Sequence, residues 1–495
     1  MEEQESSREV PVDKKRIALF NGACGQSGHI IITGQVVDIP ITESHRDEEW
    51  DLYTPIPYSQ KKKIRPIQDF GMSGVRRPRL QLEVLNHSSR NLRPHELDRV
   101  EVLFTSEEFK GNDNSFFTYE LKTDLPPGNY LIRIILRGVD SLRQSVSDLS
   151  FIGNSDSLIL KRDLPIGYGP LRILPIDYSG YIISSDIDQT FLDTRIGSTQ
   201  GLMETLFETP ESKQAIPGMP ELIREILRSQ NPPYPLHFIS ASPHFFRRTL
   251  STVFDDLDIH FSSLNLKYLA STVENVFKKT FDTIFHFDDF IKGGVSTAIN
   301  RTMKFLGSSI QSLYDQIAYK LTTLLENRLS QPRLAREVLL GDNTESDFLI
   351  FTLYQHILLG HLKGQDLEDF LYQLNFQERE ALTRDAARSI AELATLCQKK
   401  HGQHNSVVAV WINQAFQNPD QSEMRSLIAS ALPETCRDSP EVVPVKSAAG
   451  ALGFALHALE LGLIDREAVK RIWHSMKGRV YCTTPIDADF ALSAL

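Results

Sequence analysis

The sequence predicts a doubly wound parallel α/β domain that follows an antiparallel β-rich domain and precedes an α-helical domain. Three observations predict this order. Short strand patterns separated by turn residues fill residues 16–175, strand and helix patterns alternate over residues 176–362, and helical patterns dominate residues 366–495. Closely spaced short strands are typical of antiparallel sandwiches, whereas strands separated by helices indicate parallel βαβ units. A chain of 495 residues is long enough for several domains.

We expect the first region to be a sandwich-like β domain. Its strand patterns are rich in aliphatic residues, and they are HIIITGQVVD (29–38), RLQLEVL (79–85), RVEVLF (99–104) and YLIRIIL (130–136). The segment LPPGNY (125–130) carries the proline and glycine of a turn that leads into the last of these strands.

A group of basic residues lies between these strands. It comprises Lys61, Lys62, Lys63, Arg65, Arg76, Arg77 and Arg79. On an acidic chain, such a group is compatible with docking onto anionic lipid headgroups. A solvated loop is the alternative, and both interpretations stay open at this point.

The central region begins with the short apolar pattern YIIS (181–184), which predicts a buried strand. Segment 215–230 then places aliphatic residues on one helical face. LHFIS (236–240) and REVLLGD (336–342) predict two further strands. Between these two lies a long, largely helical insertion, about residues 268–318, which we expect to be a cap or an accessory face.

The last region, residues 366–495, carries helical patterns almost throughout. The clearest is IDREAVKRIWHSMKG (464–478), with Asp465 as a candidate N-cap and Gly478 just past the end. The apolar run 447–464 is interrupted by a histidine and a glutamate and is barely long enough to span a bilayer. We therefore expect a buried helix there. No pattern in this region indicates catalysis.

Composition and charge exclude some classes of function. The 53 basic and 64 acidic residues give a net charge of −11, so general electrostatic attraction to nucleic acid or to an anionic membrane is not expected, and any such contact must be local. The four cysteines lack metal-type spacing, which favours free thiols in a reducing compartment. The polar, acidic start of the chain is unlike a signal peptide. We expect a cytoplasmic protein without a transmembrane segment, with peripheral membrane contact left open and no indication of oligomeric state.

The chemistry is predicted to begin at the end of the first central strand. Asp186, Asp188 and Thr190 form a DxDxT pattern directly after that strand. Carboxylates at the carboxyl ends of parallel strands lie in the crevice where ligands bind. Two carboxylates so spaced can share one metal site, and one can attack a substrate while the other transfers protons. This arrangement is typical of phosphatases that use an aspartate nucleophile.

Partners for these aspartates follow downstream in a consistent order. Ser240 ends the second strand, where its hydroxyl can donate to a phosphate oxygen. Lys320 lies on a helix before the third strand, where its charge can stabilise a phosphoryl group. Asp342 and Asp347 in GDNTESD can complete an oxygen-rich Mg²⁺ site. Lys267, before the insertion, is the alternative to Lys320.

These motifs resemble those of the haloacid dehalogenase superfamily. More narrowly, residues 16–355 are similar to the Mg²⁺-dependent phosphatidate phosphatase family typified by the fungal actin patch protein. That family's SDIDDTI motif corresponds here to SDIDQTF, with Thr194 as the threonine that follows. Its SNSPW motif corresponds to SASPH (240–244), and GDSGExDPEIY corresponds to GDNTESDFLIF, in which Phe351 stands at the tyrosine position. An N-terminal β-rich domain is also similar to the family.

The chain departs from the family pattern at three points. Gln189 stands where the family has an aspartate outside the catalytic pair, and His244 replaces a tryptophan near the expected substrate entrance. The insertion before Lys320 is long, and Lys267, which precedes the insertion, is the alternative phosphate-binding lysine. Arg247 and Arg248 follow the second motif, where they would either meet a lipid phosphate or lie solvated on a helix surface.

The resemblance implies a role for each matching aspartate. Asp186 would attack phosphorus and form an aspartyl-phosphate. Asp188 would protonate the leaving alkoxide and later deprotonate water. Mg²⁺ would be held by Asp186, by the backbone carbonyl of Asp188 and by Asp342, with Asp347 assisting.

The remaining motif residues would bind the substrate phosphate. Ser240 and Lys320 would hold phosphate oxygens. Thr190 is assigned to the same phosphate-binding set, in which it would fix the geometry of the DxDxT loop. The implied function is the Mg²⁺-dependent dephosphorylation of phosphatidate to diacylglycerol, or of a related lipid phosphate. The alternatives are a phosphatase of a soluble phosphoester or phosphoprotein, and a non-catalytic interaction protein that keeps the fold. Metal-dependent cleavage of a generic aryl phosphate would separate the enzyme from the interaction protein.

Overall fold

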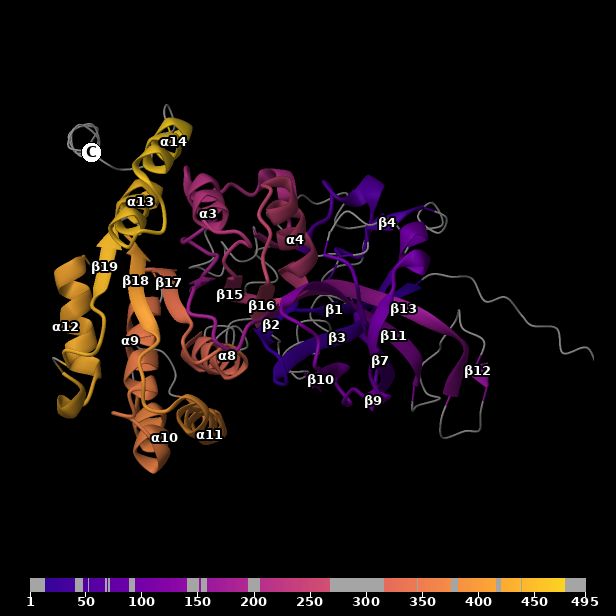
Figure 1. Ribbon diagram of the computed structural model, residues 1–495, viewed down its shortest axis with the longest axis horizontal. Helices are drawn as coiled ribbons and strands as arrows, with labels where there is room; N and C mark the ends of the chain where they lie inside the picture. The colour runs from indigo at the N-terminus through magenta and orange to yellow at the C-terminus, as the bar shows by residue number, and fades with distance from the viewer. Residues whose placement is uncertain are drawn as a thin grey trace, which may run out of the picture.

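The computed structural model describes residues 14–40, 48–51, 53–66, 69, 72–88, 94–139, 151–152, 158–194, 205–267, 316–344, 346–374, 382–414, 420–437 and 439–476. Figure 1 shows an N-terminal β-rich region at one end of the molecule, a parallel sheet with helices beside it, and the C-terminal helices at the other end. The predicted fold class is confirmed. The predicted helical insertion lies outside the described residues, apart from its last three residues.

The N-terminal region consists mainly of two sheets. The first contains β1 (Lys14–Phe20), β3 (Ile30–Pro40), β6 (Ser73–Gly74) and β10 (Phe116–Leu121). The second contains β2 (Ala23–Gln26), β7 (Pro78–Leu85), β8 (Val102–Thr105), β9 (Phe109–Lys110), β11 (Gly128–Val139), β12 (Phe151–Ile152) and β13 (Leu158–Leu174). A short hairpin of β4 (Trp50–Asp51) and β5 (Ile56–Pro57) forms a separate two-stranded sheet, and its Trp50 packs against Ile17 of β1 and Val37 of β3.

The two sheets enclose one apolar core. In β7 the alternating residues Leu80, Leu82 and Val84 are fully buried, as the period-two pattern of a half-buried strand requires. They belong to the same cluster as Ile32 of β3 and Ile132 of β11, which come from different sheets. The region is therefore a sandwich in which side chains of both sheets interdigitate. All pairings in it are antiparallel except that of β2 with β13.

The second part of the molecule is built on a six-stranded parallel sheet with the order β16-β15-β14-β17-β18-β19. Its strands are β14 (Tyr181–Ser185), β15 (Leu236–Pro243), β16 (Ser263–Lys267), β17 (Arg336–Asp342), β18 (Val407–Asn413) and β19 (Val445–Ala448). β14 lies between β15 and β17, and the chain order reverses at this point. In open α/β sheets, such a switch point is where ligands bind.

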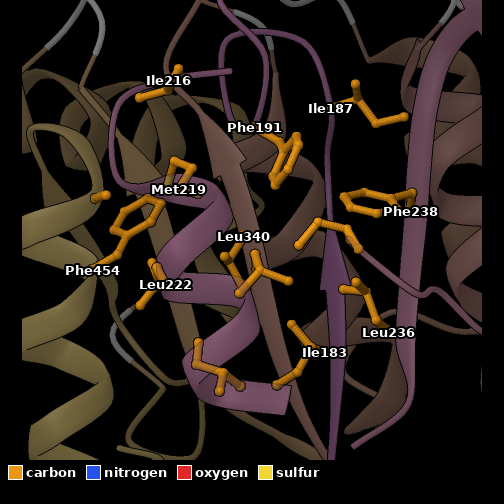
Figure 2. Close-up of a cluster of buried hydrophobic side chains, with 14 of the residues drawn as sticks. Ile183, Ile187, Phe191, Ile216, Met219, Leu222, Leu236, Phe238, Leu340 and Phe454 are labelled. Atoms are coloured by element: carbon orange, nitrogen blue, oxygen red, sulfur yellow. The ribbon is translucent and has the colours of Figure 1, made fainter. Parts of the chain in front are cut away.

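Helices cover both faces of this sheet. They are α3 (Met219–Arg228), α4 (Arg247–Asp256), α8 (Gln316–Ser330), α9 (Asp347–Leu358), α10 (Gly364–Gln373), α11 (Arg384–His401), α12 (Gln421–Ala431), α13 (Gly450–Glu460) and α14 (Arg466–Met476). On one face, α3, α4, α13 and α14 share a core with the strands. Figure 2 shows part of that core, in which Ile183, Phe238 and Leu340 of the strands lie against Met219 and Leu222 of α3 and Phe454 of α13. Helices α8 to α12 contribute to the core on the opposite face.

The C-terminal region is not helical throughout, because β18 and β19 extend the parallel sheet. Neither strand was predicted from the sequence. β18 is the run VVAVWIN, in which six residues are buried. A short, continuous apolar run lacks the alternation that marks a half-buried strand, so its periodicity does not distinguish it from a helix. The sheet therefore continues past the predicted boundary at residues 362–366.

The predicted C-terminal helices are present. Asp465 accepts a hydrogen bond from the Ala468 backbone N–H at 2.7 Å, which is the expected N-cap contact at the start of α14. Gly478 lies outside the described residues. The apolar run 447–464 contains α13, whose apolar side chains join the core shared with α3. Within the described parts of the chain, no helix has the length and hydropathy needed to cross a membrane.

Two arginines join the β-rich region to the parallel sheet. Arg247 of α4 donates hydrogen bonds to the Phe20 carbonyl at 3.1 Å and to the Leu264 carbonyl at 2.7 Å, and a further one to Asn21. Arg248 donates to Asp69 at 2.7 Å. Both arginines are buried. The expectation that they contact a lipid phosphate or lie solvated on a helix is therefore wrong, because they connect the two regions.

Buried histidines should make the fold sensitive to mild acid. Burial lowers the pKa of His237 on β15 to about 4, so this side chain is neutral in the folded protein. The unfolded chain binds a proton below about pH 6.5, so folding stability is lost as the pH falls from 6.5 towards 4. Between pH 7 and pH 5, this histidine alone should lower the free energy of unfolding by about 2 kcal/mol.

Urea unfolding at the two pH values tests this prediction. The substitution His237→Gln retains a group that can bond to Ser263, which the histidine contacts at 2.6 Å. The wild type should lose about 2 kcal/mol more than this variant between pH 7 and pH 5. Burial raises the pKa of Asp69 to about 6, which acts in the opposite direction, but this contribution is common to both proteins and cancels in the comparison. Equal losses in the two proteins would contradict the prediction.

Candidate active site

Most of the predicted site residues meet at the carboxyl ends of the central strands. Asp186 follows β14, and its backbone N–H donates to the Leu340 carbonyl of β17 at 2.8 Å. Asp342 ends β17, and Asp347 begins α9. These three aspartates are at most 2% exposed. Adjacent parallel strands end at one edge of the sheet, which brings together residues that are more than 150 positions apart in the chain.

Lys320 reaches the same place from helix α8. Its Nζ lies 3.1 Å from an Asp186 oxygen and 2.5 Å from an Asp347 oxygen. The lysine is 1% exposed. Lys267, the alternative considered from the sequence, is the last residue of β16 at the edge of the sheet. Lys320 therefore occupies the position that the sequence analysis expected for a phosphate-binding lysine.

Asp186, Asp342 and Asp347 form a group that could hold a metal ion. Each offers one carboxylate oxygen, and these oxygens lie within 4.8 Å of one another. Gly341 makes this approach possible, because a Cβ there would lie 2.6 Å from the Cβ of Asp347. The backbone of Thr344 donates to Asp342 at 2.6 Å and fixes the loop after β17.

The chemistry of this group fits a hard divalent cation. Three buried carboxylates repel one another, and each costs free energy to desolvate unless positive charge is close by. Lys320 supplies one positive charge to Asp186 and Asp347. A set of oxygen ligands favours Mg²⁺, Ca²⁺ or Mn²⁺ over softer metals. The carboxylate of Asp188 does not belong to this group.

Asp188 is instead held by three hydroxyl groups. Thr194 donates to one of its oxygens at 2.9 Å, and Ser240 and Ser242 donate to the other at 2.9 Å and 2.7 Å. The Ser240 hydroxyl also accepts a hydrogen bond from the Ser242 backbone at 3.0 Å. These contacts orient the Asp188 carboxylate and link the DxDxT loop to the end of β15.

Ser242 was missed by the sequence analysis, and Ser240 makes a different contact from the one expected. Ser240 was expected to face a phosphate, and in the structure it donates to Asp188. Ser242 lies two residues later in the same SASPH motif and contacts the same carboxylate oxygen. Its position two residues from Ser240 was the available signal, because alternate residues of a strand lie on one side.

The loop after Asp188 turns sharply. Gln189 has a φ of 56°, in the left-handed region that most side chains avoid. Its side chain donates to the Thr194 carbonyl and closes the turn. Thr190 is fully buried directly after this turn. This buried position is compatible with the expected role of Thr190 in fixing the conformation of the DxDxT loop.

The comparison with protein families agrees with this site. The family model described as "Phosphatidate phosphatase APP1, catalytic domain" matches residues 181–320. The matched segment begins with β14 and ends at Lys320, so it contains the DxDxT and SASPH motifs. Residues 181–320 therefore correspond to an APP1-type phosphatidate phosphatase catalytic domain. A search of curated proteins found no match.

The APP1-type domain is that of a phosphatase, and the family implies phosphatidate as the substrate. Asp342 and Asp347 lie beyond the matched segment. The structure nevertheless places both beside Asp186. The buried acidic group thus combines a residue inside the matched segment with two residues outside it.

Asn413, from the C-terminal region, supports the APP1-type site, and the sequence analysis did not identify it. It ends β18, is 3% exposed, and its side-chain amide donates to the Gln189 carbonyl at 2.6 Å. Its side-chain oxygen accepts from the Gly450 backbone at 3.0 Å, and its backbone carbonyl accepts from Asn343 at 3.1 Å. One residue therefore connects the DxDxT loop, the Asp342 loop and the start of α13.

Replacing Asn413 should impair catalysis more than substrate binding. The change Asn413→Leu removes a donor and an acceptor whose partners are then unsatisfied, at about 1–3 kcal/mol for each group. We expect kcat for an aryl phosphate to fall about tenfold or more with a nearly unchanged KM, since the Asp186–Asp188 loop loses its support. Val410→Ala on the same strand is a control that weakens packing without touching this loop. If Asn413→Leu and Val410→Ala were equally stable and lost equal kcat, Asn413 would have no specific part in catalysis.

His244 is buried at the end of the second motif. It is 5% exposed and follows directly after β15. Burial, together with the charge of Arg247, lowers its pKa to about 3, so the imidazole is neutral at physiological pH. The expectation that it shapes the substrate entrance remains a prediction.

Proposed function

We propose that the protein is a Mg²⁺-dependent phosphomonoesterase that acts through an aspartyl-phosphate and converts phosphatidate to diacylglycerol. The observation that carries this proposal is the contact of Lys320 with Asp186 and Asp347 inside one buried acidic group, beside Asp188. Such a group has little structural purpose without a cation or an anionic substrate, because buried charges of one sign destabilise a fold.

In the proposed first step, a carboxylate oxygen of Asp186 attacks phosphorus as the bond from phosphorus to the leaving oxygen breaks. Protonated Asp188 gives its proton to that oxygen, which leaves as the hydroxyl of diacylglycerol. In the second step, ionised Asp188 takes a proton from water as the water oxygen attacks the aspartyl-phosphate. This step releases inorganic phosphate and restores Asp186 and protonated Asp188.

The three hydroxyls on Asp188 suit this exchange of protons. Thr194, Ser240 and Ser242 hold the carboxylate in one orientation. A fixed carboxylate avoids the entropy loss of orientation when the transition state forms. In this proposal Ser240 orients the Asp188 carboxylate rather than binding the phosphate, and Lys320 binds the phosphate oxygens. Thr190 fixes the conformation of the DxDxT loop that carries Asp186 and Asp188.

Asp186, Asp342 and Asp347 would hold the Mg²⁺, with the backbone carbonyl of Asp188 as a further ligand. When bound, Mg²⁺ neutralises charge on the phosphate and reduces its repulsion from the carboxylates. Lys320 supplies a second positive charge at the same place. Together these charges allow a dianionic phosphate to approach a carboxylate nucleophile.

The substrate class rests on the family model rather than on a lipid-binding surface. The basic residues between 61 and 79 are largely engaged in ion pairs. Lys61 lies 2.5 Å from Asp51, Arg77 lies 2.7 Å from Asp113, and Arg79 contacts Glu108 at 2.5 Å. Anionic headgroups would have to compete with these carboxylates, so we place no lipid site on this stretch. Peripheral membrane contact stays a proposal, to be tested by binding to anionic liposomes.

The test of the proposed function is phosphate release from phosphatidate in mixed micelles, with Mg²⁺ and with EDTA, for the wild type and Asp188→Asn. We expect release that requires Mg²⁺ and is lost in the variant. Release from p-nitrophenyl phosphate alone would retain the mechanism and discard the lipid substrate. If both substrates stayed intact, the phosphatase proposal would be abandoned in favour of an interaction protein.

A further inference from the structure

A cavity of about 500 Å³ lies at the opposite edge of the parallel sheet from the active site. Gly180 precedes β14, Tyr234 precedes β15, and Arg336 begins β17, and all three line this cavity. Parallel strands begin at one edge and end at the other, so the cavity is separate from the site at Asp186. The β-rich region contributes further wall residues, including Asn129 of β11 and Arg172 of β13.

Two arginines in this cavity carry charge that no described carboxylate balances. Arg172 is only 9% exposed, and its side chain donates to the Pro233 carbonyl. Arg336 donates to the Ser179 carbonyl at 3.0 Å and to the Tyr181 hydroxyl at 3.1 Å. Within the described ranges, neither guanidinium has a carboxylate oxygen within 4.0 Å, although Asp177 also lines the cavity. A buried charge is normally paired, so the buried Arg172 calls for an anion, and the exposed Arg336 adds a second positive charge in the same cavity.

The arginines still have donors available for that anion. A guanidinium has five N–H donors. The hydrogen bond from Arg172 to the Pro233 carbonyl uses one nitrogen, and those from Arg336 to Ser179 and Tyr181 use two. Tyr181 fixes the orientation of Arg336, because the guanidinium lies over the Tyr181 ring at 3.9 Å from its centre. A planar, pre-oriented guanidinium suits phosphate, whose oxygens it can bind in pairs.

The size and walls of the cavity indicate more than a bare ion. Volumes of about 300–1,000 Å³ are usual for sites that take small organic ligands. Tyr178 and Tyr234 provide aromatic surface in the wall, and Gln230 provides an amide. Ile176, next to the lining residues Pro175 and Asp177, is 80% exposed. An exposed aliphatic side chain beside a cationic cavity suits a phosphate that carries an apolar group.

We propose that this cavity is a second ligand site, which binds a phosphate monoester between Arg172 and Arg336 without a metal ion. The phosphate can belong to a small soluble molecule or to a lipid headgroup. Because the β-rich region and the parallel sheet both line the cavity, the bound ligand contacts both regions. The site takes no part in the proposed hydrolysis and does not depend on that proposal.

Calorimetric titration tests this site, with sodium phosphate and with dioctanoyl phosphatidate as separate probes. The protein is the full chain carrying Asp186→Asn, kept in EDTA, so that neither hydrolysis nor a metal ion contributes. Into this background we introduce Arg336→Gln, Arg336→Lys and Arg172→Gln. Arg228→Gln is the matched control, because Arg228 is an exposed arginine paired with Asp258. Thermal melting checks that each variant is folded, and Arg336, which is exposed at the start of β17, is the substitution best tolerated.

We expect at least one probe to bind, with Kd raised about tenfold or more by Arg336→Gln and by Arg172→Gln, since each removes a charge-assisted hydrogen bond. Arg336→Lys should raise Kd less than Arg336→Gln does, and Arg228→Gln should leave it unchanged. Equal affinity for both probes would assign the site to the phosphate group alone, and binding of phosphatidate only would assign it to a lipid phosphate. Absence of binding of both probes, or a Kd that Arg336→Gln does not change, would overturn the proposal.

Discussion

Replacing Asp186 with asparagine is expected to lower phosphatase activity about 10⁴-fold or more, because in the proposed mechanism its carboxylate forms the aspartyl-phosphate. The amide is a poor nucleophile and a weaker metal ligand than the carboxylate. Phosphate release from p-nitrophenyl phosphate under saturating Mg²⁺ measures this loss. The same variant should form no acid-stable phosphoprotein when labelled substrate is added.

The fold should tolerate the Asp186→Asn change well. Asp186 lies within 4.8 Å of two other buried carboxylates, and its conversion to an amide removes one of three mutually repelling charges. We therefore expect an unchanged or slightly higher melting temperature in EDTA. Asp193→Asn is a suitable control, since Asp193 is an exposed aspartate in the same loop and should keep full activity. A variant that retained a tenth of the activity would exclude Asp186 as the nucleophile.

Replacing Lys320 with methionine is expected to reduce both activity and stability. Lys320 lies between two buried carboxylates, at 3.1 Å from Asp186 and 2.5 Å from Asp347. Its removal leaves buried negative charge without this partner, which typically costs about 3–5 kcal/mol. Activity should fall about 10³-fold, since the transition-state charge on the phosphoryl group also loses a cation.

The response to Mg²⁺ distinguishes this electrostatic effect from simple misfolding. A divalent cation bound by Asp186, Asp342 and Asp347 would replace part of the lost charge, so Mg²⁺ should raise the melting temperature of Lys320→Met more than that of the wild type. Lys213→Met is the matched control, because the Lys213 side chain is 2% exposed and pairs with Glu208 outside this acidic group. An equal response to Mg²⁺ in Lys320→Met and Lys213→Met would argue against a metal site at these aspartates.

Local patterns were sufficient to place most residues of the candidate site on the correct elements. The strand that ends before Asp186 was visible as a short apolar run, and GDNTESD follows another such run. Because parallel strands end at a common edge, the meeting of Asp186 with Asp342 and Asp347 followed once both strands were assigned to one sheet. Helix α14 and its cap at Asp465 were equally local features, set by neighbours in sequence.

Other features could not be read from local patterns. The choice of Lys320 over Lys267 depends on how helix α8 packs against β15, and the intervening insertion conceals that relation in the sequence. Arg247 and Arg248 are indistinguishable from solvated helix residues until the β-rich region covers them. Asn413 lies 224 positions from the carbonyl that it contacts.

The sequence by itself determined the class of the fold, the alternation of strands and helices around β14, β15 and β17, and the identity of the acidic residues at the strand ends. These depend on hydrophobic periodicity and on contacts between neighbours in the chain. Only the tertiary structure decided that the C-terminal region completes the sheet, that three hydroxyls hold Asp188, and that Arg172 and Arg336 share a cavity. These features arise from packing between distant segments, where burial changes the cost of every charge and hydrogen bond and no local pattern records the partner.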